Sequence, residues 1–128
     1  MRAKIKYLAI PASLIMILAA SALIAFAQIQ VSNIGVTLKE WSIDMIKDVP
    51  EGTVIFKVTN KGEHSHNFEI MGNSIDKKFN EEIKPGESNT MSIDLTEGTY
   101  KIFCPVGSHA ENGMSLDLVV TKRMQQEK

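Results

Sequence analysis

The chain has 128 residues, of which 44% are hydrophobic and 23% charged, so it has the length of one domain and the composition of a globular protein. This composition excludes fibrous and disordered proteins. After the N-terminal segment, the basic residues do not cluster before the short Lys122-Arg123 pair. Because binding of phosphates needs a clustered basic surface, we expect no nucleic-acid partner.

The N-terminal segment contains no acidic residue through position 30. Basic residues between positions 2 and 6 precede an apolar run over residues 7–26, and residues 25–27 read Ala-Phe-Ala, a small-x-small pattern that signal peptidases cleave. We interpret residues 1–27 as a signal peptide and residues 28–128 as the exported domain. The alternative is an uncleaved anchor, with membrane attachment through residues 7–27, because the apolar run nearly reaches across a hydrocarbon core of about 30 Å.

Export would place the domain outside the cytoplasm, in a periplasm or on the outer face of the cytoplasmic membrane, where we expect a monomer. Without the leader, the domain has 11 basic and 15 acidic residues, a net charge of −4. Its single cysteine, Cys104, has no partner in the chain for a disulfide. An unpaired thiol in an oxidising compartment is a liability unless it is buried, joined to another chain or bound to a metal.

From residue 36 onward the sequence consists of short alternating runs separated by turn residues, with no convincing helical period. This pattern predicts an all-β sandwich or barrel. The expected strands cover residues 36–45, 53–59, 66–71, 90–95, 99–103 and 114–121. Residues 74–82 show no clear period, and we expect a loop or a short helix at the sandwich edge.

Successive residues on a strand point to opposite faces, so the alternation also predicts which side chains face the core. The expected inward sets are Val54, Phe56 and Val58; Phe68 and Ile70; Met91, Ile93 and Leu95; and Leu116, Leu118 and Val120. The same parity turns His66, Cys104 and Met114 inward at strand ends. Trp41 and Phe103 are also expected to be core residues.

The informative stretch runs from Cys104 to Met114, with His109 midway and four residues between each successive pair. A thiolate, an imidazole and a thioether can thus reach one ion from a single loop. Sulfur and imidazole ligands favour copper or zinc, and a second imidazole with a weak thioether contact is typical of electron-transfer copper sites. His66 supplies that imidazole and is followed by Asn67. His64 is the alternative ligand, although it lacks a following Asn.

An upstream His-Asn paired with Cys-x4-His-x4-Met before a final apolar strand resembles the cupredoxins, such as plastocyanin and azurin, and by loop length rusticyanin and sulfocyanin. The resemblance covers roughly residues 35–121, including the turn at residues 85–88 and the approach to the cysteine strand at residues 98–100. It implies a Greek-key β-sandwich that binds one mononuclear copper ion. The implied ligands are His66, Cys104, His109 and Met114, and Asn67 is implied to join the two ligand loops by hydrogen bonds near the cysteine sulfur.

The function that follows from the resemblance is electron transfer at a type 1 site that cycles between Cu(I) and Cu(II), without enzyme activity. The implied partners are redox proteins such as cytochromes or a copper oxidase or reductase, and electrons are expected to pass at His109, between Val106 and Ala110. One alternative is a copper carrier or storage module, for which the scattered methionines are weak support. Another is a cysteine enzyme using Cys104 and His109, which leaves Met114 and His66 unexplained.

Overall fold

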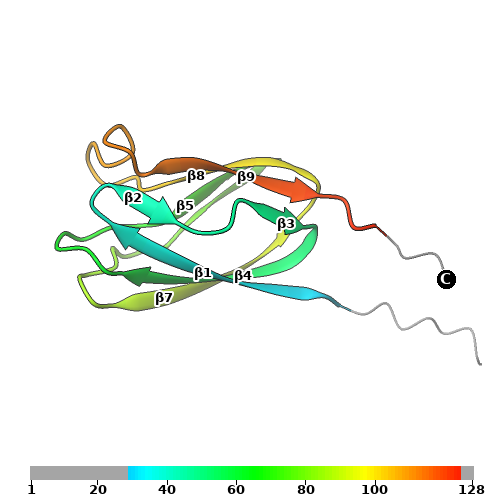
Figure 1. The fold of residues 1–128 in the computed structure, drawn as a ribbon, viewed down its shortest axis with the longest axis horizontal. Helices are drawn as coiled ribbons and strands as arrows, with labels where there is room; N and C mark the ends of the chain where they lie inside the picture. The colour runs from blue at the N-terminus through cyan, green and yellow to red at the C-terminus, as the bar shows by residue number, and fades with distance from the viewer. Residues whose placement is uncertain (1–28, 125–128) are drawn as a thin grey trace, which may run out of the picture.

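Alternating apolar and polar residues form nine strands in the computed structural model, which describes residues 29–124 (Figure 1). The strands are β1 (Val31–Lys39), β2 (Ser42–Asp44), β3 (Asp48–Pro50), β4 (Gly52–Asn60), β5 (Glu69–Gly72), β6 (Ile75–Lys78), β7 (Ser88–Leu95), β8 (Gly98–Phe103) and β9 (Ser115–Thr121). None of the described residues forms a helix that is long and apolar enough to cross a membrane. The predicted signal or anchor segment, with its boundary at residue 27, lies outside them.

The strands make two sheets, with orders β2-β1-β4-β7 and β3-β9-β8-β5-β6. Most neighbours are antiparallel, but β1 runs parallel to β4, and β3 runs parallel to β9. The sheets pack face to face around one apolar core, so the predicted all-β sandwich is confirmed. The core takes alternate residues from each strand, and Val54, Phe56 and Val58 are all fully buried.

The predicted inward sets hold for most positions. Phe68, Ile70, Met91, Leu95, Leu118 and Val120 are buried, while Ile93 and Leu116 are half-buried and pack against the core. The parity also holds for His66, Cys104 and Met114, which are each 0% exposed. The alternation in the sequence therefore predicts the core well wherever a regular strand forms.

Several local predictions are wrong. Residues 36–45 are not one strand, because the chain reverses after Lys39 and β2 pairs back onto β1. Trp41 lies in this turn and is 42% exposed, so it is not in the core. Residues 75–78 form β6 rather than a loop or helix, since they pair with β5 at the sheet edge. His66 lies ahead of β5, where it makes an isolated bridge with Ile83.

Phe103 is half-buried at the end of β8 and does not belong to the core cluster, so its predicted place in the core is also wrong. The long loop between β8 and β9 lies at one end of the sandwich, together with the turn between β1 and β2 (Figure 1). The last described residues, which follow β9, lie at the opposite end of the sandwich. Loops distant in sequence thus meet at the end that carries the predicted ligands.

Candidate metal centre

The loop after β8 is closed by its own backbone. The N–H of Cys104 donates to the carbonyl of Met114 at 3.0 Å, and the N–H of Met114 donates to the carbonyl of His109, also at 3.0 Å. A further bond from His109 N–H to the Val106 carbonyl tightens the first turn. These bonds hold all three predicted downstream ligands in a small space, as their sequence spacing indicates.

Gly113 permits the last turn of this loop. Its φ of 129° is one that side-chain-bearing residues rarely adopt. A Cβ at this position would also lie 2.7 Å from the carbonyl oxygen of Trp41, which comes from the turn between β1 and β2. The absence of a side chain therefore lets that turn pack against the loop just before Met114.

His66 is held by Ile83, which is distant in sequence, and by the side chain of Asn60 at the end of β4. It exchanges two backbone hydrogen bonds with Ile83, of 3.1 and 2.7 Å. The buried Asn60 amide donates to the carbonyls of both His64 and Ile83 at 2.7 Å, and its oxygen accepts from Gly62 N–H. The loop before β5 is thus fixed to the segment before β7 at the position of the histidine.

The two arms bring three potential ligand atoms together. His66 Nδ1 lies 3.1 Å from His109 Nδ1 and 3.9 Å from Cys104 Sγ, and the His109 Nδ1 to Cys104 Sγ distance is 3.5 Å. All three atoms lie within 4.8 Å of one another. Met114 is fully buried next to them, since its backbone bonds to both Cys104 and His109.

His64, the alternative upstream ligand, lies outside this group. Its side chain is 64% exposed, and its Nδ1 is 3.4 Å from the carboxylate of Glu40. Of the two upstream histidines, His66 alone belongs to the buried cluster of potential ligands.

Asn67 joins the two arms, but through its backbone. Its N–H points at Cys104 Sγ at 3.4 Å, whereas its side-chain amide donates to the Phe79 carbonyl at 2.9 Å. The side-chain oxygen accepts from Phe68 N–H. A backbone N–H near the sulfur stabilises the thiolate and fixes the cysteine relative to the histidine that precedes Asn67.

The surroundings keep the cysteine and the downstream histidine neutral. Burial raises the pKa of the Cys104 thiol, and the Asn67 N–H opposes this rise only in part. Burial also lowers the pKa of His109, and the adjacent His66 lowers it further. The His66 and His109 rings and the buried Cys104 thiol direct nitrogen and sulfur atoms into a common space, and a cation there would stabilise the thiolate. This donor set suits a soft or borderline metal ion.

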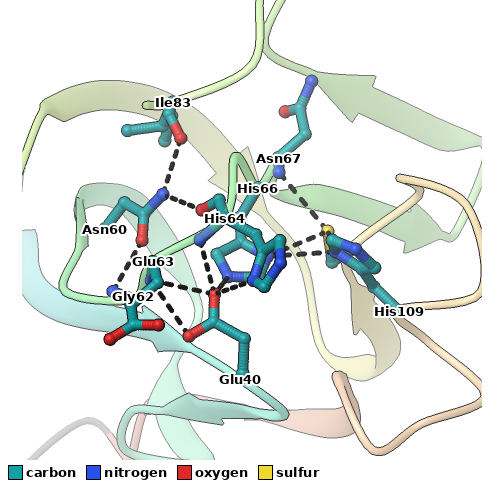
Figure 2. A network of polar contacts seen from close by, with 10 residues as sticks. Glu40, Asn60, Gly62, Glu63, His64, His66, Asn67, Ile83 and His109 are labelled. Carbon is teal, nitrogen blue, oxygen red and sulfur yellow. Dashed lines mark hydrogen bonds and ion pairs between the residues drawn. The ribbon is translucent and has the colours of Figure 1, made fainter. Parts of the chain in front are cut away.

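Two residues next to the site, Glu40 and Trp41, were not predicted from the sequence to be part of it. Both lie in the turn between β1 and β2. Figure 2 shows the Glu40 carboxylate facing the segment that carries His64 and His66. Hydrogen bonds from the backbone N–H groups of His64 and Glu63 hold the pKa of Glu40 well below its usual range. Trp41 packs edge-on against the ring of His109, with centroids 4.9 Å apart.

A signal for Glu40 was present in the strand alternation. Glu40 follows Ile34, Val36 and Leu38 with the same parity, and those three are buried. Extending the inward face by one more position would have placed its carboxylate toward the ligand end. No comparable signal marked Trp41.

Comparisons with known proteins agree with this architecture. The sequence model of the cupredoxin-like domain matches residues 9–116, which is most of the chain. The chain belongs to the cupredoxin-like domain family. The predicted family is therefore confirmed, and a buried cluster of two imidazoles and a thiol in this family identifies the cofactor as one copper ion. No curated protein sequence matches the chain.

Solved structures share the fold at low identity. Auracyanin from the photosynthetic bacterium Roseiflexus castenholzii is 18% identical, with 70% of this chain and 97% of that chain covered and a TM-score of 0.61. Rusticyanin from Thiobacillus ferrooxidans is 17% identical, with coverages of 71% and 77% and a TM-score of 0.54. A chain from a heme-copper terminal oxidase dimer is 16% identical, with coverages of 86% and 95% and a TM-score of 0.56.

Proposed function

We propose that this chain is an extracytoplasmic electron carrier that binds one copper ion through His66, Cys104, His109 and Met114. The convergence of two imidazole nitrogens and a thiol within 4.8 Å is the observation that carries the proposal. Met114 would be the weak axial ligand, because its backbone is bonded to both downstream ligands and its side chain is fully buried. Copper bound by this set would accept and release single electrons.

The frame around the four residues suits electron transfer because little in it has to move. The downstream loop is closed by its own backbone bonds, and the upstream histidine is fixed by Ile83 and Asn60. A ligand frame held in one geometry reduces the rearrangement needed when the ion changes charge. Four protein ligands also leave no coordination position for a substrate, which supports a carrier rather than an oxidase.

We propose that electrons pass at the edge of His109. This side chain is half-buried, and Val106 and Ala110 on either side of it are half-buried as well. Trp41 adds an exposed aromatic ring that contacts the same imidazole. A small apolar patch of this kind suits a redox partner that docks closely and leaves quickly.

Partners and location belong to the same proposal. A cytochrome, or a copper oxidase or reductase, is the expected class of partner, and a related fold occurs within a heme-copper terminal oxidase dimer. The basic and apolar N-terminal segment, with its Ala-Phe-Ala site, supports export to the periplasm or to the outer membrane face. We propose that the domain works there as a monomer, either released after residue 27 or attached through residues 7–27.

The visible absorption spectrum of the copper-loaded protein tests this function. An intense band from thiolate-to-copper charge transfer, which bleaches on reduction and returns on oxidation, is the expected result. A copper carrier or storage module would bind the ion without this reversible band, and a cysteine enzyme would need no copper. Either outcome would replace the proposed function.

A further inference from the structure

The carboxylate of Glu40 accepts several hydrogen bonds beside the candidate metal centre (Figure 2). Its Oε1 accepts a hydrogen bond from His66 Nε2 at 2.8 Å and from the His64 backbone N–H at 2.9 Å. The backbone N–H of Glu63 lies 3.1 Å from Oε1 and 3.0 Å from Oε2. An ionised carboxylate can only accept hydrogen bonds, so every one of these contacts points a proton at it.

The contact with His66 determines which ring nitrogen carries the proton. Because Nε2 faces a carboxylate, the proton of the neutral ring belongs on Nε2, and Nδ1 keeps its lone pair. Nδ1 is the atom that lies 3.1 Å from His109 Nδ1 and 3.9 Å from Cys104 Sγ. The pairing therefore presents the ring in the tautomer and orientation that a metal ion at this site requires.

The chain makes room for this carboxylate at Gly62. A Cβ at this position would overlap the carboxylate of Glu40, with its Oε2 only 2.6 Å away. The Glu40 side chain is 20% exposed, and that of His66 is 0% exposed, so the pair is largely shielded from water. A charge so placed acts on the buried ring more strongly than a charge on the open surface would.

We propose that Glu40 is a positioning residue of the copper centre, which fixes the Nε2–H tautomer of His66 and favours Cu(II) over Cu(I). This inference rests on the proposed function. Reduction adds one electron to the ion, with no proton transferred between Glu40 and His66 and no bond formed between them. A fixed negative charge stabilises the doubly charged ion more than the singly charged one, so it lowers the reduction potential.

The first test measures the Cu(II)/Cu(I) reduction potential of the copper-loaded Glu40→Gln variant. This substitution keeps the length of the side chain and one acceptor oxygen but removes the negative charge. Glu63→Gln is the matched control, since it removes a carboxylate from the facing loop without touching His66. We expect about a tenfold shift of the Cu(II)/Cu(I) equilibrium toward Cu(I) in Glu40→Gln, a rise of ~59 mV for one electron. A potential equal to that of Glu63→Gln would overturn the assigned effect of the charge.

The second test uses the metal-free protein and NMR of the ring nitrogens of His66. Wild type should show the Nε2–H form, Glu40→Ala should show a mixture of tautomers, and Gly62→Ala should move toward that mixture because it displaces the carboxylate without removing it. A wild-type ring protonated at Nδ1, or an unchanged tautomer in Glu40→Ala, would contradict the proposal. Because this measurement needs no copper, its failure is distinct from the absence of a charge-transfer band in the wild type.

Discussion

The two arms of the candidate metal centre are built in different ways. The downstream arm, residues 104–114, closes on itself through backbone bonds between residues a few positions apart. The upstream arm, residues 60–67, has no such backbone closure. The side chain of Asn60 bonds within it to Gly62 N–H and to the His64 carbonyl, and Ile83 and Glu40, which come from two other segments, hold His66. Because the downstream arm closes locally, it can be predicted from the sequence. The conformation of the upstream arm also depends on contacts that form only in the folded sandwich.

The largest effect is expected from removing the sulfur of the downstream arm. Cys104→Ser should abolish the visible charge-transfer band of the copper-loaded protein, because the thiolate is its source. The sandwich should stay folded, since serine fits in the same space. Absorption spectroscopy measures the band, and far-ultraviolet circular dichroism checks the fold. A band of wild-type intensity in this variant would show that the assigned ligand is wrong.

The upstream arm is tested by a pair of histidine variants. His66→Ala should lose or strongly alter the copper spectrum, because its Nδ1 faces the other two ligands. His64→Ala should leave the spectrum nearly intact, because that side chain is largely exposed and lies outside the cluster. The same absorption titration with copper serves both. The reverse result would reassign the ligand to His64.

The side chain of Asn60, which bonds within the upstream arm and joins that arm to Ile83, can also be tested. Asn60→Ala removes three hydrogen bonds at a fully buried position and should lower the free energy of unfolding by about 3 kcal/mol. Copper affinity should fall as well, because the loop carrying His66 loosens. Urea denaturation and copper titration measure the two effects, and the exposed Asn80→Ala is the control. If copper affinity stays unchanged while stability falls, Asn60 supports the fold without positioning the ligand.

The smallest structural change is expected at the rim of the downstream arm. Val106→Glu or Ala110→Lys should slow electron transfer to a small cytochrome, because a charge there must lose water on docking. The absorption spectrum should be almost unchanged, since neither residue is a proposed ligand. Stopped-flow oxidation at matched ionic strength compares the rates while controlling for electrostatic steering. Equal rates in wild type and both variants would show that electrons do not pass through this patch.

Much of this protein follows from its sequence. Alternating residues in β4, β7, β8 and β9 predict the core, because a strand with one buried face must repeat every two residues. The regular spacing of Cys104, His109 and Met114 between two predicted strands predicts a loop from which all three side chains can reach one ion. Combined with His66 and Asn67, those patterns carry the resemblance to the cupredoxins that implied the family and the copper cofactor, and both are confirmed.

Only the tertiary structure decided what surrounds the upstream histidine. The reversal after Lys39 turned an expected strand into a turn, exposed Trp41 against His109, and brought Glu40 to His66. The Glu40–His66 contact joins residues 26 positions apart in the chain, and no local pattern specifies which distant segments will meet. The sequence thus determined the donor types and most of the fold, whereas packing of the two sheets selected the neighbours that orient the donors.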